Sequence, residues 1–124
     1  MAPAVEKARN LAFILEEAPG TLSRDVVTIA SGAGKLEAGT VLGKLTAGGK
    51  YVPSPDAGAD GSQVAIAVLA YAVDATSADV TDAVVIANDA EVKNPMLIFH
   101  ASVSDSTKRN AKLTQLRAVN IKAR

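Results

Sequence analysis

Short hydrophobic runs, separated by clusters of Gly, Pro, Ser and Asp, occupy most of the chain. These runs are rich in Val and Ile and are too short for amphipathic helices, so they are typical of β-strands. Gly48 and Gly49 separate two of them, which predicts a hairpin turn. We expect strands over residues 24–30, 41–46, 50–52, 64–73, 80–87 and 96–101, with turns at 31–34 and 47–49 and a loop at 53–62.

The run from Val64 to Val73 differs from the others because it is apolar on both faces. A strand with one solvated face alternates apolar and polar residues, whereas a strand without that alternation is covered on both sides. We therefore expect this strand to be buried on both faces, by its own fold or by other copies of the chain.

The hydrophobic period changes near the end of the chain. Leu113, Leu116 and Val119 recur at three-residue spacing, which predicts a helix with one apolar face. Either Ser104 or Asp105 can cap its first turn. With a short strand at 120–122, these elements predict a mainly β (α+β) fold, a small barrel-like domain over residues 21–124 with one C-terminal helix.

Residues 1–20 are expected to form an extended N-terminal arm that ends at the helix-breaking pair Pro19-Gly20. Its apolar run at 10–15 fits a strand around Phe13 and Ile14, but a short helix over 5–17 is an alternative. In that helix one stripe would hold Val5, Ala8, Ala12 and Leu15. An apolar run so near a terminus is buried either on its own core or on a partner.

Composition narrows the classes of function. The chain lacks Cys and has one histidine, His100, which excludes disulfides, thiolate metal sites and mechanisms with two histidines. No apolar run reaches the ~20 residues of a membrane-spanning helix, and the first residues show no export signal. Alanine fills 24 of 124 positions, so a lone domain buries little apolar area per residue. Self-association is therefore expected.

Charge is balanced overall but segregated along the chain. Residues 51–92 hold seven acidic residues and no basic one, whereas residues 93–124 hold seven basic residues and Asp105. The basic block indicates a solvated helix face, including Lys108, Arg109, Lys112 and Arg117. There are two alternatives. Acidic and basic surfaces of neighbouring copies can meet in an oligomer, or residues 108–124 can bind nucleic acid. The zero net charge and the absence of interleaved aromatics speak against nucleic acid.

No set of residues forms a recognised catalytic, cofactor or metal motif. The Gly39–Lys44 segment lacks the spacing and the Ser/Thr of a phosphate-binding loop. Ser23 and His100 lack the Gly-x-Ser-x-Gly context of a hydrolase nucleophile. Lys93 in a turn suggests a β-rich carrier or small-ligand-binding domain as the alternative function, although the usual tripeptide around a carrier lysine is absent. We therefore expect no enzyme and no cofactor.

The order of several short motifs resembles the lambda-type bacteriophage head decoration proteins. The resemblance runs from about Leu11 to Ile121. It rests on Phe13–Ala18, Ser23–Asp25, Leu36–Lys44, Gly49–Tyr51, Asp60-Gly61, Val68-Leu69, Ala72–Ala75, Asp89–Val92 and Ser104–Arg109. The sequence departs from the family at Met96–His100, where members often carry a tryptophan.

The resemblance implies a structural protein without catalysis. It implies a homotrimer that sits on three-fold and quasi-three-fold sites of the expanded head. There it contacts the major capsid protein on the outer surface of the virion and resists the pressure of packaged DNA. It also implies a late protein that assembles in the host cytoplasm and needs neither nucleic acid nor membrane as a direct partner.

We expect the arm to reach the capsid by adding a strand to an exposed sheet edge. This capsid-binding arm comprises Asn10, Leu11, Ala12, Phe13, Ile14, Leu15 and Glu16. The alternative is that its apolar residues fold back on their own sheet.

Overall fold

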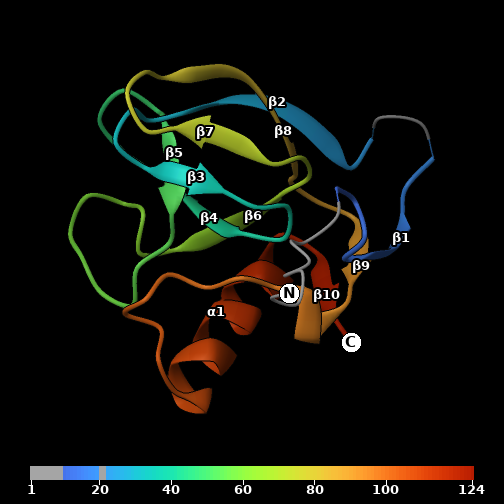
Figure 1. The fold of residues 1–124 in the computed structure, drawn as a ribbon. Coiled ribbons are helices and arrows are strands. Elements are labelled where there is room, and N and C mark those ends of the chain that lie inside the picture. Colours follow the sequence, from blue (N-terminus) through green and yellow to red (C-terminus); the bar gives the residue numbers. More distant parts are fainter. Residues whose placement is uncertain (1–9, 20–21) are drawn as a thin grey trace, which may run out of the picture.

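The structure, a computed structural model, describes residues 10–19 and 22–124. Strands are the main regular structure in this part of the chain, and they are accompanied by one α-helix near the C-terminus (Figure 1). The elements are β1 (Ile14–Glu17), β2 (Arg24–Ile29), β3 (Gly34–Leu36), β4 (Val41–Lys44), β5 (Tyr51–Pro53), β6 (Ala65–Leu69), β7 (Val73–Ala75), β8 (Val80–Ile86), β9 (Ala90–Val92), the 3₁₀-helix η1 (Asn94–Met96), α1 (Ser106–Ala118) and β10 (Ile121–Ala123).

Five strands close into a barrel in the order β2-β5-β4-β6-β8. All neighbours are antiparallel except β2 and β5, which are parallel and meet at Ile29 and Tyr51. The barrel encloses a cluster of small and branched residues, namely Ile29, Leu42, Ala67, Leu69, Ala75, Ala83 and Val85. Three alanines, Ala67, Ala75 and Ala83, thus help to fill a narrow interior, as expected for a barrel of few strands.

A second cluster lies outside the barrel and holds α1 and a small sheet against it. That sheet has the order β1-β9-β10 and lies beside the barrel (Figure 1). The cluster includes Phe13, Val41, Val68, Ile86, Val92, Leu97, Leu116 and Ile121. Alternate residues of β6 pack into different clusters: Ala67 and Leu69 lie in the barrel cluster, and Val68 lies in the second cluster. This confirms that β6 is covered on both faces.

The architecture confirms the mainly β fold with a barrel and one C-terminal helix, but the strand over 64–73 is shorter than predicted. β6 ends at Leu69, and a bend at residues 70–72 leads into β7, which pairs with β3. Ala70 still donates a hydrogen bond to the Val84 carbonyl in the β6–β8 register, whereas Ala72 donates to the Asn10 side chain, so the pairing with β8 ends at the bend. The apolar run therefore covers two strands, and β3 begins within the predicted turn at 31–34.

The strand predicted over 96–101 is not formed. Pro95 lies within η1, where its missing N–H and fixed φ suit a helical turn better than a sheet. Residues after η1 run extended, but only Ile98 forms a bridge, a parallel one with Thr40. In contrast β9, which the sequence did not predict, forms the centre of the small sheet.

The C-terminal helix is confirmed, and Asp105 is its N-cap. The Asp105 carboxylate accepts a hydrogen bond from the backbone N–H of Lys108 at 2.9 Å. Leu116 is fully buried, and Leu113 and Val119 pack against the same cluster. One prediction on this helix is wrong, because Lys112 is 1% exposed and does not belong to a solvated basic face.

Candidate functional site

The arm residues that the sequence singled out lie folded against the barrel. Asn10 accepts a hydrogen bond on Oδ1 from the backbone N–H of Ala72 at 2.9 Å. Leu11 donates its backbone N–H to the Ala70 carbonyl at 3.0 Å and turns the chain with φ +65°. These contacts fix the start of the described segment on the bend between β6 and β7. Residues 5–9 of the alternative helix lie outside the described residues, and residues 14–17 form a strand.

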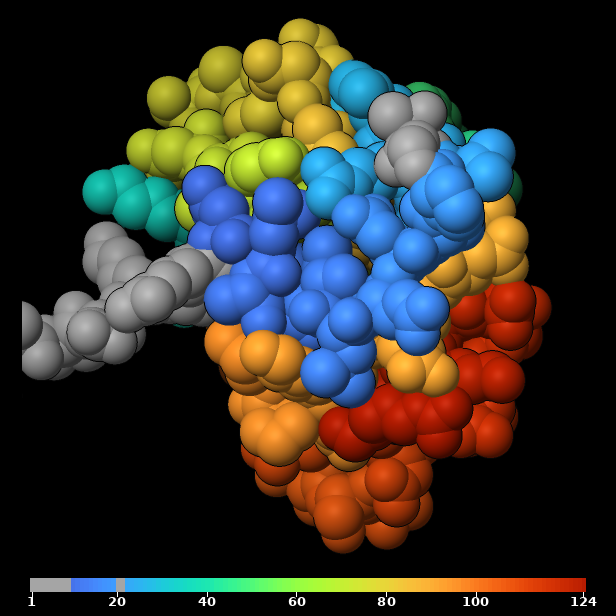
Figure 2. Space-filling view, turned by 90° about the vertical axis from the view of Figure 1, so that its right-hand side faces the viewer, coloured from blue at the N-terminus to red at the C-terminus, as the bar shows by residue number. Residues whose placement is uncertain are grey.

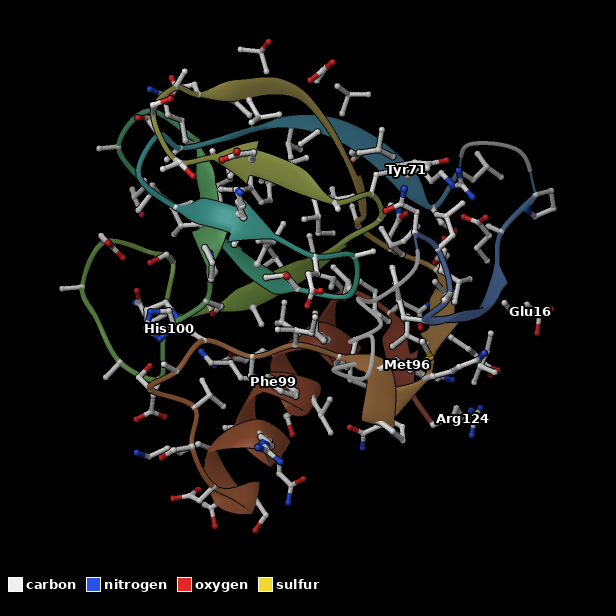
Figure 3. All side chains as sticks on the ribbon, viewed as in Figure 1. Glu16, Tyr71, Met96, Phe99, His100 and Arg124 are labelled. Carbon is white, nitrogen blue, oxygen red and sulfur yellow. The ribbon has the colours of Figure 1, made fainter. Side chains whose placement is uncertain are left out.

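Side chains of this segment divide between the core and the surface. Phe13 is 1% exposed, lies in the second cluster and accepts a hydrogen bond on its carbonyl from Lys93 N–H at 2.6 Å. Leu15 is 49% exposed, and Glu16 points away from the body of the molecule (Figure 3). Leu11, Ala12 and Ile14 are half-buried. The segment is therefore attached by Phe13 and offers Leu15 and Glu16 to the outside.

β1 leaves one backbone edge open. It pairs antiparallel with β9, with a bulge between Ile14 and Glu16, and β9 pairs in parallel with β10. Among the described strands, none lies on the other side of β1. An open edge presents backbone donors and acceptors that can pair with a strand from another chain.

An ion pair attaches the end of β1 to the start of β2. The Arg24 guanidinium donates two hydrogen bonds to the Glu17 carboxylate, at 2.6 Å from Nη2 and 3.0 Å from Nε. Its Nη1 also donates to the Tyr71 hydroxyl at 3.4 Å. These hydrogen bonds from Arg24 lower the pKa of Glu17 below its usual value, and the carboxylate raises the pKa of Arg24. Both side chains are about one quarter exposed, so the pair is partly shielded from water.

Ser23 holds the same corner through its side chain. The buried hydroxyl accepts a hydrogen bond from Ala18 N–H at 2.8 Å and donates one to the Asp89 carbonyl at 2.9 Å. It thereby links the chain after β1 to the turn before β9. Sequence reasoning missed Glu17, Ser23 and Arg24 as supports of β1, because opposite charges seven residues apart do not by themselves indicate a contact.

An open hollow lies over β1, β9 and β10, and four of its five charged lining residues are acidic. Glu17 is neutralised by Arg24, and Glu91 pairs with Arg124 at 2.8 Å. Glu16 has no ion-pair partner among the described residues. The residues lining the hollow are Glu16, Glu17, Ala18, Pro19, Asp89, Ala90, Glu91, Asn120 and Lys122.

The residues that the sequence analysis considered for catalysis, phosphate binding or a carrier role lie in different parts of the fold. His100 lies at the surface, far along the chain from β1, and its Nδ1 is 2.8 Å from Ser102 Oγ (Figure 3). Ser23 is occupied by the two contacts above. Lys93 is half-buried between β9 and η1, and Gly43 is buried within β4.

Within residues 10–19 and 22–124, no group of three or more His, Cys, Asp or Glu residues is arranged to hold a metal ion. No helix in the same part of the chain has the length and apolar content needed to cross a bilayer.

The fold and this surface define a small β-barrel protein with an additional sheet. That sheet, β1-β9-β10, combines an N-terminal strand with C-terminal ones, and β1 forms its open edge. Comparison with protein-family models identifies the family, since residues 3–121 match the bacteriophage lambda head decoration protein D family. The match covers nearly the whole chain, so the protein belongs to this family and is a phage head decoration protein. The search of curated proteins returned no match.

Family membership confirms the resemblance seen in the sequence. It implies a structural role, a location on the virion capsid and association with the phage head.

Proposed function

We propose that this protein forms homotrimers that bind the three-fold and quasi-three-fold sites of the expanded head. Bound on the outer surface, the trimers contact the major capsid protein and stabilise the shell against packaged DNA. Residues 1–20 act as the capsid-binding arm and residues 21–124 as the decoration domain. The protein is made late and assembles on heads in the host cytoplasm.

The open edge of β1 is the observation that carries the proposed mode of binding. Residues 10–16 bind the capsid by pairing with an extended segment of the shell protein at this edge. In the folded chain this segment is already ordered by Asn10, Phe13 and the Arg24–Glu17 pair. Ordering a backbone costs about 1–2 kcal/mol per residue, and here folding supplies that ordering before the shell is met. A preformed edge therefore binds more tightly than a free arm of the same sequence.

Three such edges on one trimer increase the affinity further. A single short edge buries few side chains, so one protomer binds weakly. Linking three binding sites on a rigid body raises the overall affinity by about 10²–10⁴ when all three reach their partners. A symmetric trimer on a three-fold site meets that condition, and each trimer then joins several shell subunits that cannot separate independently.

Binding of the purified protein to expanded, undecorated heads tests the proposal. The oligomer is first sized by light scattering, and binding is then measured by co-sedimentation with heads. Leu15→Asp places a charge at the open edge and should reduce head binding at least tenfold. Val64→Asp, at an exposed apolar residue outside residues 10–16, is the matched control and should bind as the wild type does.

Deleting residues 1–16 is a poor test because it removes Phe13 from the core. Deleting residues 1–9 keeps that anchor and separates their contribution from that of the edge. A wild-type protein that is monomeric, or that fails to sediment with heads, contradicts the proposed function. Full binding by Leu15→Asp contradicts the role of residues 10–16 alone.

A further inference from the structure

Exposed large hydrophobic residues gather next to the open edge. Within the described residues, four such side chains are well exposed, and three of them lie between positions 15 and 26. They are Leu15 at 49%, Leu22 at 68% and Val26 at 69%, whereas the fourth, Val64, belongs to another part of the chain. In Figure 2, residues 10–19 and the residues that follow position 21 lie side by side on one face.

Strand register places Val26 in a small apolar patch on the outside of the barrel. Val26 pairs with Val84 across the antiparallel β2–β8 ladder, so both side chains stand on the same face of the sheet. The next pair on that face is Arg24 with the buried Ile86. Leu22, which is 68% exposed, lies in the turn that leads into β2, two residues before Arg24. We call Leu22, Val26 and Val84 the β2 patch.

Side-chain contacts connect the start of β2, beside the β2 patch, to the end of β1. Arg24 lies between Leu22 and Val26 in sequence and binds Glu17 at the end of β1. Ser23 joins the same corner to Ala18 and to Asp89. A chain segment that pairs with β1 therefore approaches the patch without any movement of these elements.

Charge at this surface further defines the partner. The hollow along β1 holds four carboxylates, from Glu16, Glu17, Asp89 and Glu91, against one lining base, Lys122. Arg24 and Arg124 neutralise two of the four, which leaves Glu16 and Asp89 against Lys122, an excess of one negative charge. A partner with Lys or Arg opposite Glu16 is favoured over one with acidic residues.

From these observations we infer that the head-binding surface extends from the β1 edge onto the β2 patch. Its partner is an extended segment of the shell protein that carries apolar side chains against Leu22 and Val26 and a basic side chain against Glu16. The inference rests on the proposed function and adds residues outside 10–16 together with the chemistry of the partner. A shell segment is preferred over a second copy of the chain because the patch is continuous with the proposed head-binding edge.

Variants at the patch test the inference on expanded, undecorated heads that the wild type binds. Leu22→Asp and Val26→Asp should each weaken co-sedimentation at least tenfold and leave the size of the oligomer unchanged. Val26→Ser is a milder variant, expected to weaken binding by several fold. Val64→Asp is the control for a new charge at an exposed valine. Thermal unfolding of each variant shows whether the fold is intact, as expected for residues that are mostly exposed.

A charge reversal tests the basic side chain of the partner. Glu16→Lys should weaken head binding several fold, and added salt should weaken the wild type more than Glu16→Gln. Asp74→Lys, at an exposed acid on β7, is the control and should bind normally.

Three results distinguish the proposals. Wild-type binding of heads by folded Val26→Asp and Leu22→Asp overturns the inference and leaves the proposed function intact. Dissociation of the oligomer by these variants also overturns it, because the patch then lies between copies. Failure of the wild type itself to bind heads removes the proposed function.

Discussion

Gly43 shows how closely the barrel packs at the scale of a single residue. A Cβ at this position would stand 2.8 Å from Ser62 Cα and would also meet the Ser62 carbonyl oxygen. Ser62 cannot easily yield, because its carbonyl accepts a hydrogen bond from Ser54 Oγ at 2.7 Å. Gly43→Ala should therefore lower the free energy of unfolding by about 1–3 kcal/mol or more, measured by urea denaturation. Gly58→Ala, whose Cβ has no neighbour nearer than 3.8 Å, should change it little.

Lys112 is a buried cation, and no carboxylate in the described part of the chain forms an ion pair with it. Its Nζ donates to Ser54 Oγ at 3.0 Å and to the Gln63 carbonyl, which ties the long loop before β6 to α1. Burial disfavours the charged amine and lowers the pKa of Lys112 below 10.5, with a smaller opposing effect from Asp56. Between the lowered pKa and 10.5, the unfolded chain binds more protons than the folded one, so the contribution of Lys112 to stability rises with pH.

The corresponding experiment compares wild type with Lys112→Met in urea at several pH values. The stability of the wild type relative to Lys112→Met should increase as the pH rises from 7 toward 10. A difference that is constant or falls over this range contradicts the buried-cation account. Lys44→Met, at an exposed lysine on β4, should show no such increase.

At the scale of the element, β1 is held by side chains more than by its own ladder, which has four residues and a bulge. The Arg24–Glu17 pair is bidentate and three-quarters shielded, so Arg24→Met should cost about 1 kcal/mol at pH 7. Because the folded-state pKa of Glu17 is lowered from 4.5, this stabilisation is present above pH 4.5 and is lost as the pH falls through the lowered value.

Denaturation of wild type and Arg24→Met at pH 7 and at pH 3 measures this effect, and the difference should shrink at the lower pH. Arg124→Met is the matched control, because Arg124 also pairs with a carboxylate of the small sheet but is 58% exposed. If the two variants lose the same free energy of unfolding at pH 7, partial burial does not strengthen the Arg24–Glu17 ion pair.

At the scale of the whole molecule, the proposed trimer predicts that binding depends on how many intact edges each oligomer carries. Mixed oligomers are prepared from wild-type and Leu15→Asp protomers, with a tag on one of them, and compete for undecorated heads. Since three linked sites multiply affinity by about 10²–10⁴, each defective protomer should reduce affinity by roughly tenfold to a hundredfold. Mixed oligomers that bind as well as the wild type would show that a single edge suffices.

The elements recognised from sequence are those with a strong local pattern. The hairpin at Gly48-Gly49 and the apolar stripe of α1 are each specified by neighbouring residues, and each is present. Of the two candidate caps, Ser104 and Asp105, the structure has Asp105. The strand expected at 96–101 failed because its apolar residues pack as an extended segment after Pro95. β9 was missed because Ala90–Val92 is three residues long and owes its conformation to β1 and β10 on either side.

The candidate site was only partly visible in the sequence. The apolar character of residues 10–16 indicates a segment that is buried somewhere, but not that Phe13 enters the core while Leu15 stays outside. The side chains that hold β1 in place, those of Glu17, Ser23 and Arg24, meet only when the chain has folded. Val26 was predicted only as a residue of the strand over 24–30, and Leu22 was not singled out, because exposure is a property of the folded surface.

The sequence by itself determined the mainly β fold, the C-terminal helix and the likeness to head decoration proteins, since these depend on local periodicity and on the order of motifs along the chain. Only the tertiary structure decided that β1 pairs with β9, that no other described strand lies along its far edge and that Lys112 is buried. The physical reason is distance along the chain. A pattern of neighbours fixes local conformation, whereas an edge, a patch or a buried charge is defined by segments that meet only when the barrel closes.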